Sequence, residues 1–271
     1  RFTAKRARRW SPLRVANTAL GAISFLALEA IGAATTLSYG FTNVSLAILA
    51  VGTLIFLTGV PISYYASRYG VDIDLLTRGA GFGYIGSTIT SLIYASFTFI
   101  FFAIEAVILA IAIEMMTGLP RALGYLVSAL VVIPLVTHGI TWISRFQLWT
   151  QPLWIVLQIA PFIAILHYEP DALSDWMGFT GRHGDLGGGF SLILFGAASS
   201  VMFSLVAQIG EQVDFLRFLP RERSGKRWSW WLALISAGPG WIIIGALKML
   251  AGSFLAVYAL KQGVTEEQAV E

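Results

Sequence analysis

Four ionisable side chains interrupt apolar stretches of this sequence and are the first candidates for chemistry: Glu29, Glu105, Glu211 and Lys248. A charge at the centre of a membrane helix costs roughly 2.5–3.5 kcal/mol on insertion scales, so each of these residues needs a physical reason to be there. Carboxylates in a polar cavity could bind a cation, a proton or a ligand rich in hydrogen-bond donors. The alternative is a structural ion pair, for example Glu105 with Lys248, and for Lys248 we favour such pairing or snorkelling.

Small or polar residues accompany two of these acids. Glu29 precedes a run of small residues that includes Gly32 and Ala33, and Glu211 follows Gln208 in another apolar stretch. Small residues either let helices pack closely or let a helix unwind, which frees backbone carbonyls to bind a cation. The sequence leaves both interpretations open. We predict a cation or proton site at Glu29, Gly32 and Ala33, with sodium as one candidate ion, and substrate contacts at Gln208 and Glu211.

The other reactive residue types argue against an enzyme. The chain has no Cys, which excludes disulfides, thiolate metal sites and cysteine nucleophiles. Its three histidines have no metal-ligand spacing, and no Ser-His-Asp arrangement is recognisable. Residues 81–86 satisfy the pattern G-x-G-x-x-G, but that pattern binds a dinucleotide only between a strand and a helix. We therefore predict no enzymatic activity and no cofactor.

Seven apolar stretches could carry these residues across a membrane, which takes about 20 apolar residues per helix. They cover approximately 15–40, 43–65, 87–116, 121–140, 147–167, 190–211 and 229–260. The seventh is long enough to need a bend, which we expect at Gly238-Pro239-Gly240. Charged residues make up 12% of the 271 positions, about half the roughly 25% typical of soluble domains. The sequence predicts an all-α, polytopic transmembrane helix bundle that contacts the lipid bilayer.

The distribution of Lys and Arg predicts the orientation of the bundle. With the N-terminus inside, fourteen of these residues fall in inner segments and three in outer segments. Inner segments of membrane proteins are enriched in Lys and Arg, so we expect a multi-pass protein of the inner or plasma membrane with a cytoplasmic N-terminus. The same bias explains the basic pI of about 9.3 without a nucleic-acid partner. Residues 1–14 form a basic cytoplasmic segment, 15–260 the membrane domain and 261–271 an outer segment, after which we expect the chain to continue.

Three segments carry an ordered series of motifs. Residues 69–86 contain Tyr-Gly, then Arg, then Phe-Gly-x-x-Gly ahead of the third apolar stretch. Residues 214–218 read Asp-Phe-Leu-Arg-Phe after the sixth stretch, and residues 137–140 read Thr-His-Gly-Ile ahead of Pro152. This order resembles the nucleobase–cation symporters, the purine, cytosine, allantoin and hydantoin permeases, whose D-F-x-R-Y signature here ends in Phe.

The resemblance implies a five-plus-five inverted-repeat (LeuT-like) transporter fold, of which this chain covers the first seven helices. It implies secondary active transport of a small polar, nucleobase-like solute by alternating access, driven by sodium or protons. In such a fold the first and sixth helices are interrupted, here at Glu29–Gly32 and near Gln208–Glu211. The resemblance also places an aromatic platform at Phe101, where relatives carry Trp, and a substrate contact at Glu105, where a Gln is common.

These two departures leave a second hypothesis open. A Glu at position 105 favours a cationic or proton-donating ligand, or itself takes up the proton, over a classical nucleobase. The chain could then be a transporter-like membrane domain that senses a small-molecule ligand and is fused, beyond residue 271, to a cytoplasmic signalling module such as a histidine kinase.

Overall fold

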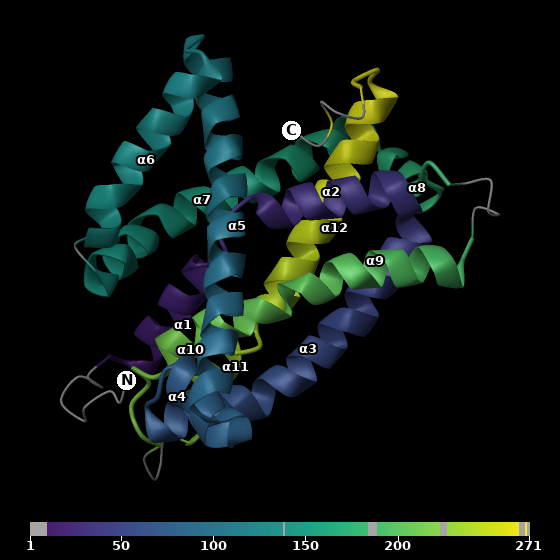
Figure 1. Ribbon diagram of the computed structural model, residues 1–271. Helices are drawn as coiled ribbons and strands as arrows, with labels where there is room; N and C mark the ends of the chain where they lie inside the picture. The colour runs from purple at the N-terminus through teal and green to yellow at the C-terminus, as the bar shows by residue number, and fades with distance from the viewer. Residues whose placement is uncertain (1–9, 138, 184–188, 223–226, 266–268, 270–271) are drawn as a thin grey trace.

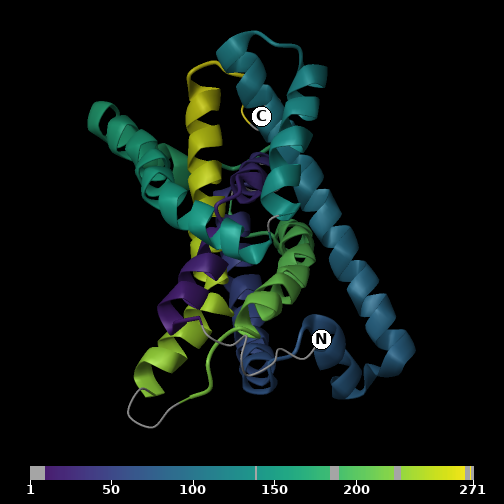
Figure 2. The ribbon, with the colours of Figure 1, turned by 90° about the vertical axis from the view of Figure 1, so that its left-hand side faces the viewer.

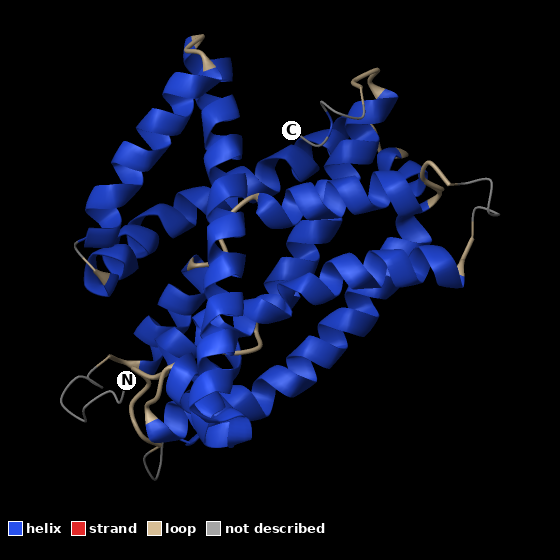
Figure 3. Ribbon diagram, viewed as in Figure 1, coloured by secondary structure: helices blue, strands red, loops and turns tan. Residues whose placement is uncertain are grey.

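The computed structural model of the chain describes residues 10–137, 139–183, 189–222, 227–265 and 269. Every regular element in these residues is a helix, which confirms the all-α prediction (Figures 1 and 3). In chain order the elements are α1 (Pro12–Gly21), α2 (Ala27–Tyr39), α3 (Phe41–Tyr69), α4 (Ile73–Thr77), a π-helical turn (Arg78–Phe82), α5 (Gly83–Thr117), α6 (Arg121–Thr137), α7 (Ile140–Tyr168), α8 (Ala172–Met177), α9 (Leu192–Ser204), a 3-10 turn (Leu205–Ala207), α10 (Gln208–Leu216), α11 (Arg227–Ala237) and α12 (Trp241–Lys261). The described residues do not include residues 1–9 of the predicted basic segment 1–14, or His138. They also leave out residues 266–268, 270 and 271 of the predicted outer segment 261–271.

Five helical stretches are long and apolar enough to cross a membrane, and they indicate a membrane protein. They are Phe41–Tyr69, Ile73–Thr117, Thr141–Tyr168, Leu192–Leu216 and Trp241–Lys261. The other two predicted spans differ. The apolar helix α6 is shorter than these five, and the predicted span 15–40 is divided between α1 and α2. Neither α1 nor α2 has the roughly 20 residues that a straight crossing of the membrane requires.

The surface of α5 shows why the bundle suits a hydrocarbon environment. Only Ser87, Ala110 and Ile111 are buried along this 35-residue helix. Large apolar side chains such as Ile93 and Phe99 are exposed over most of their surface. A soluble protein rarely exposes a continuous apolar face of this size, whereas lipid chains would cover it.

Several of the segments expected on the inner side of the membrane lie at one end of the bundle, although the end of α6 and the start of α7 do not. Figures 1 and 2 show α1, α4, α10 and α11 at one end, and the turn between α5 and α6 with the last turns of α12 at the other. The main core of buried apolar side chains lies among α1, α3, α9, α10, α11 and α12. The most extensive contact between two helices joins α2 to α12.

The first predicted span is interrupted at residues 22–26, between α1 and α2. The interruption was expected at Glu29–Gly32, and that prediction is wrong because both residues lie within the regular helix α2. The seventh predicted span is interrupted where expected, since α11 ends at Ala237 and α12 begins at Trp241. Pro239 there packs against Gly59 of α3, where an added Cβ would lie 3.2 Å from its ring.

Candidate functional site

The interruption between α1 and α2 exposes a backbone donor to Glu105. The first N–H groups of a helix have no acceptor within the helix. Here the backbone N–H of Ala27, the first residue of α2, donates to Glu105 Oε1 at 2.7 Å. A carboxylate at a helix N-terminus also interacts favourably with the helix dipole. Glu105, on α5, therefore holds the start of α2, and in the described part of the chain no Lys or Arg forms an ion pair with it.

Lys248 forms a buried structural ion pair, as we favoured, but its partner is Glu29 and not the Glu105 named as an example of such a pair. Lys248 Nζ lies 2.5 Å from Glu29 Oε1, and the two side chains are 3% and 12% exposed. The amide of Gln158 on α7 donates to the same carboxylate oxygen at 2.8 Å. Lys248 Nζ also lies 4.7 Å from the ring centroid of Trp154, one turn earlier on α7. The pair leaves no net charge at this depth, which is the usual condition for burying a carboxylate.

A cleft between α2, α5, α6, α7 and α12 connects the two acids. Its larger part, about 530 Å³, is bordered by Ser24, Leu26, Glu105, Trp154 and Gln158 among others. A smaller part of about 310 Å³ is bordered by Glu29, Ala33 and Gly252. The two parts share Leu26, Ile108, Leu157 and Gln158, so they adjoin. Pockets for small ligands are typically about 300–1,000 Å³ and largely apolar with a few polar groups, as here.

Two buried polar atoms beside this cleft have no hydrogen-bond partner among the described residues. One is an acceptor, Glu29 Oε2, and the other is a donor, Trp154 Nε1. Buried polar groups are nearly always paired, so an unpaired acceptor and donor next to a cleft favour a polar ligand that would pair with them.

The small residues at Gly32 and Ala33 serve packing rather than unwinding. A Cβ at Gly32 would lie 1.9 Å from the carbonyl oxygen of Met249, and a Cβ at Gly252 would lie 2.0 Å from that of Glu29. Two glycines thus bring the backbones of α2 and α12 into contact. Carbonyls near Gly32 are also occupied, because the Thr35 hydroxyl lies 2.6 Å from the Ile31 carbonyl and 3.2 Å from that of Gly32. Backbone oxygens are therefore not freed for a cation at Gly32.

Phe101 lies beside the interruption of the first helix. Its ring packs edge-on against Phe25, in the segment between α1 and α2, at 5.4 Å between centroids. It also contacts Phe97 at 4.4 Å. The neighbouring Phe102, one residue on, borders the cleft. The predicted aromatic platform at Phe101 is thus engaged by other phenylalanines in this structure.

Gln208 and Glu211 form a separate polar group at the start of α10. The 3-10 turn Leu205–Ala207 interrupts the helix immediately before Gln208, close to the predicted position. The Gln208 amide donates to Glu211 Oε2 at 2.5 Å. Tyr94 of α5 covers Gly210, where an added Cβ would lie 2.8 Å from its ring. Neither Gln208 nor Glu211 borders the cleft that holds Glu29 and Glu105.

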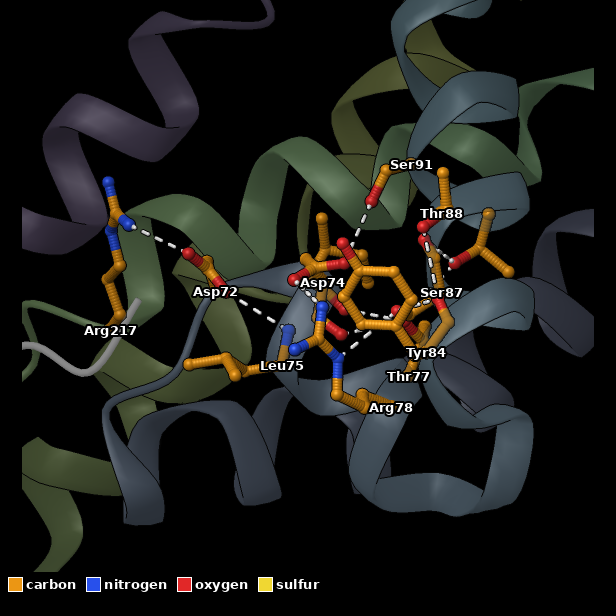
Figure 4. Close-up of polar contacts among 12 residues, drawn as sticks. Asp72, Asp74, Leu75, Thr77, Arg78, Tyr84, Ser87, Thr88, Ser91 and Arg217 are labelled. Carbon is orange, nitrogen blue, oxygen red and sulfur yellow. Dashed lines mark hydrogen bonds and ion pairs between the residues drawn. The ribbon is translucent and has the colours of Figure 1, made fainter.

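The motif segments 69–86 and 214–218 meet through an ion pair. Arg217 lies 3.7 Å from Asp72, which also caps α4 by accepting from the backbone N–H of Leu75 at 3.1 Å (Figure 4). Arg78 pairs with Asp74 at 2.9 Å. Gly81 has a non-helical backbone, with φ at 106°, and lies at a kink between α4 and α5. The described residues contain no strand before it, so the geometry of a dinucleotide-binding loop is absent there.

Sequence reasoning missed two residues of the site, Gln158 and Trp154. Both are neutral residues in an apolar helix, and their spacing of four places them on one face of α7. That spacing was the available signal, but it does not reveal which helix the face contacts. No cluster of three or more metal-ligating side chains occurs in the part of the chain that the structure describes.

No family model, curated protein or solved structure matches the chain.

Proposed function

We propose that this chain forms the solute-binding part of a cation-coupled secondary transporter, in the cell membrane and with a cytoplasmic N-terminus. The observation that carries the proposal is the interrupted first helix, whose free N-terminus faces Glu105 in a cleft of about 530 Å³. Interrupted membrane helices point their ends at bound solutes and ions in transporters of the inverted-repeat type.

The arrangement of the two interrupted helices supports an inverted-repeat fold of the LeuT type. The segment α1–α2 packs against the segment α9–α10, with α1 against α10 and α2 against α9. The two segments therefore run antiparallel to each other. An inverted repeat relates the first helix of one half to the first helix of the other in this opposed sense.

The chemistry of the cleft favours a small polar solute. Glu105 accepts the Ala27 N–H and borders the cleft, where its carboxylate can also meet a ligand donor or take up a proton. The unpaired Trp154 Nε1 offers a donor, and apolar residues such as Leu109 and Val132 form most of the wall. A flat heterocycle with both donors and acceptors, such as a nucleobase or hydantoin, matches this combination.

The test is ligand-dependent stabilisation of the purified protein, followed by uptake into proteoliposomes. Nucleobases, hydantoins and related cyclic amides would be screened by thermal unfolding with and without sodium. A ligand at a hundredfold excess over its Kd stabilises by about 2.7 kcal/mol, which corresponds to several degrees. We expect Glu105→Gln to abolish the shift and the uptake.

Glu114→Gln is the matched control, because Glu114 lies on the same helix but is exposed and pairs with Arg121. This variant should keep both responses. Stabilisation without uptake would contradict transport and favour a ligand-sensing domain. A screen in which no compound stabilises the folded protein would contradict the proposed solute class.

A further inference from the structure

We propose that Lys248 fills, with its own ammonium group, the monovalent-cation site that Glu29 would otherwise offer to a free ion. The lysine stem is buried, and its Nζ lies 2.5 Å from Glu29 Oε1. The counter-charge of Glu29 is thus part of the protein and comes from α12, not from solution.

Three groups give the site the chemistry of an ammonium receptor. Glu29 supplies the carboxylate, and the Trp154 ring lies 4.7 Å from Lys248 Nζ, within the range of a cation–π contact. Gln158 holds the carboxylate from the opposite helix at 2.8 Å. A sodium site on a broken helix would instead use unwound backbone carbonyls. Here α2 is regular from Ala27 onward and the carbonyls of Ile31 and Gly32 are already engaged.

The charged groups around Lys248 indicate which carboxylate could bind a coupling ion. Glu29 faces it from α2, Lys248 from α12 and Glu105 from α5, while α7 contributes the neutral Trp154 and Gln158. Lys248 neutralises Glu29, so Glu105 is the carboxylate left to exchange charge through the cleft. If the proposed transport function holds, a coupling ion would act at Glu105 and sodium would not bind at Glu29.

The experiment measures thermal unfolding of the purified protein while NaCl replaces N-methyl-D-glucamine chloride at constant ionic strength. For the wild type we expect no saturable shift that Glu29→Gln abolishes. Lys248→Met keeps the stem of the side chain as far as Cε but removes the ammonium, so its Tm should fall. Ammonium chloride should then raise that Tm by several degrees in a saturable manner, because NH4+ fits the position of the missing group.

Lys261→Met is the matched control, since Lys261 ends the same helix, is half exposed and pairs with Asp175. It should respond to neither salt. Glu29→Gln combined with Lys248→Met should also be unresponsive, because the carboxylate that attracts the cation is gone.

Two results would overturn the proposal. One is a saturable rise in the wild-type Tm with sodium that Glu29→Gln abolishes, which would show that a free ion binds Glu29 despite Lys248. The other is a folded Lys248→Met variant that responds to no monovalent cation. If Lys248→Met fails to fold, the wild-type sodium titration decides. No solute is involved, so these results are independent of whether transport is demonstrated.

Discussion

Replacing Gly32 with alanine should force α2 and α12 apart. An added Cβ would lie 1.9 Å from the carbonyl oxygen of Met249 and 2.6 Å from its Cα. Carbon and oxygen atoms in contact are normally about 3.3 Å apart or more, so the two backbones must separate by roughly 1.4 Å. No side-chain rotation can relieve the clash, because the atoms in the way belong to the backbone.

The expected cost lies at the upper end of the range for overpacked sites, about 3 kcal/mol. For domains of roughly 150–250 residues, each kcal/mol corresponds to about 2–4 °C in Tm, so a fall of roughly 6–12 °C is expected. The separation would also lengthen the contact between Glu29 and Lys248, which lie on the same two helices.

Thermal unfolding of the purified variant, followed by tryptophan fluorescence, measures this effect. Gly196→Ala in α9 is the matched control, because nothing lies within 4 Å of a Cβ added there. That variant should be as stable as the wild type or slightly more stable, since alanine favours helix over glycine by about 0.8–1.0 kcal/mol. Equal Tm values for the two variants would refute the close approach of α2 and α12.

Three further substitutions test contacts that position the site, each by equilibrium chemical unfolding. Glu29→Gln leaves a buried lysine without its carboxylate and should lower the free energy of unfolding by about 3–5 kcal/mol. Adding Lys248→Met to it should recover most of that loss, and a double variant no more stable than Glu29→Gln would contradict the pairing. Asn43→Ala removes three hydrogen bonds from α3 to backbone groups at the end of α2 and just before α9, and should cost about 1–3 kcal/mol; an unchanged midpoint would contradict their role. Ser144→Ala removes the buried hydroxyl to which Thr18 donates at 2.9 Å, and should cost about 1 kcal/mol, whereas no loss would show that α1 and α7 pack without it.

Much of the helix layout follows from hydropathy. The predicted stretches 87–116 and 147–167 lie within α5 and α7, because long apolar runs have few alternatives to a helix in lipid. The bend at Gly238-Pro239-Gly240 was also predictable, since a proline flanked by two glycines breaks a helix more readily than the isolated prolines that α3, α6 and α7 accommodate. In these places the cause of the structure is local.

The interruption of the first helix is only partly explained by local sequence. α1 ends at Gly21, but residues 22–26 read Ala-Ile-Ser-Phe-Leu and contain neither Gly nor Pro. The helix nevertheless begins again at Ala27, whose N–H donates to Glu105, 78 positions away. The hydrogen bond to Glu105 thus fixes where the helix begins again. A short stretch of sequence does not contain that information, because the acceptor lies far away along the chain.

The candidate site also depends partly on the sequence of each helix and partly on how the helices pack. Composition and the cost of burying charge were enough to single out Glu29, Glu105 and Lys248 as residues that need partners. Which acid meets the lysine depended on how α2 and α12 rotate against each other, and the contacts at Gly32 and Gly252 set that rotation. Hydropathy is summed along one helix, whereas a pairing depends on the relative rotation and depth of two helices, which exist only once they are packed.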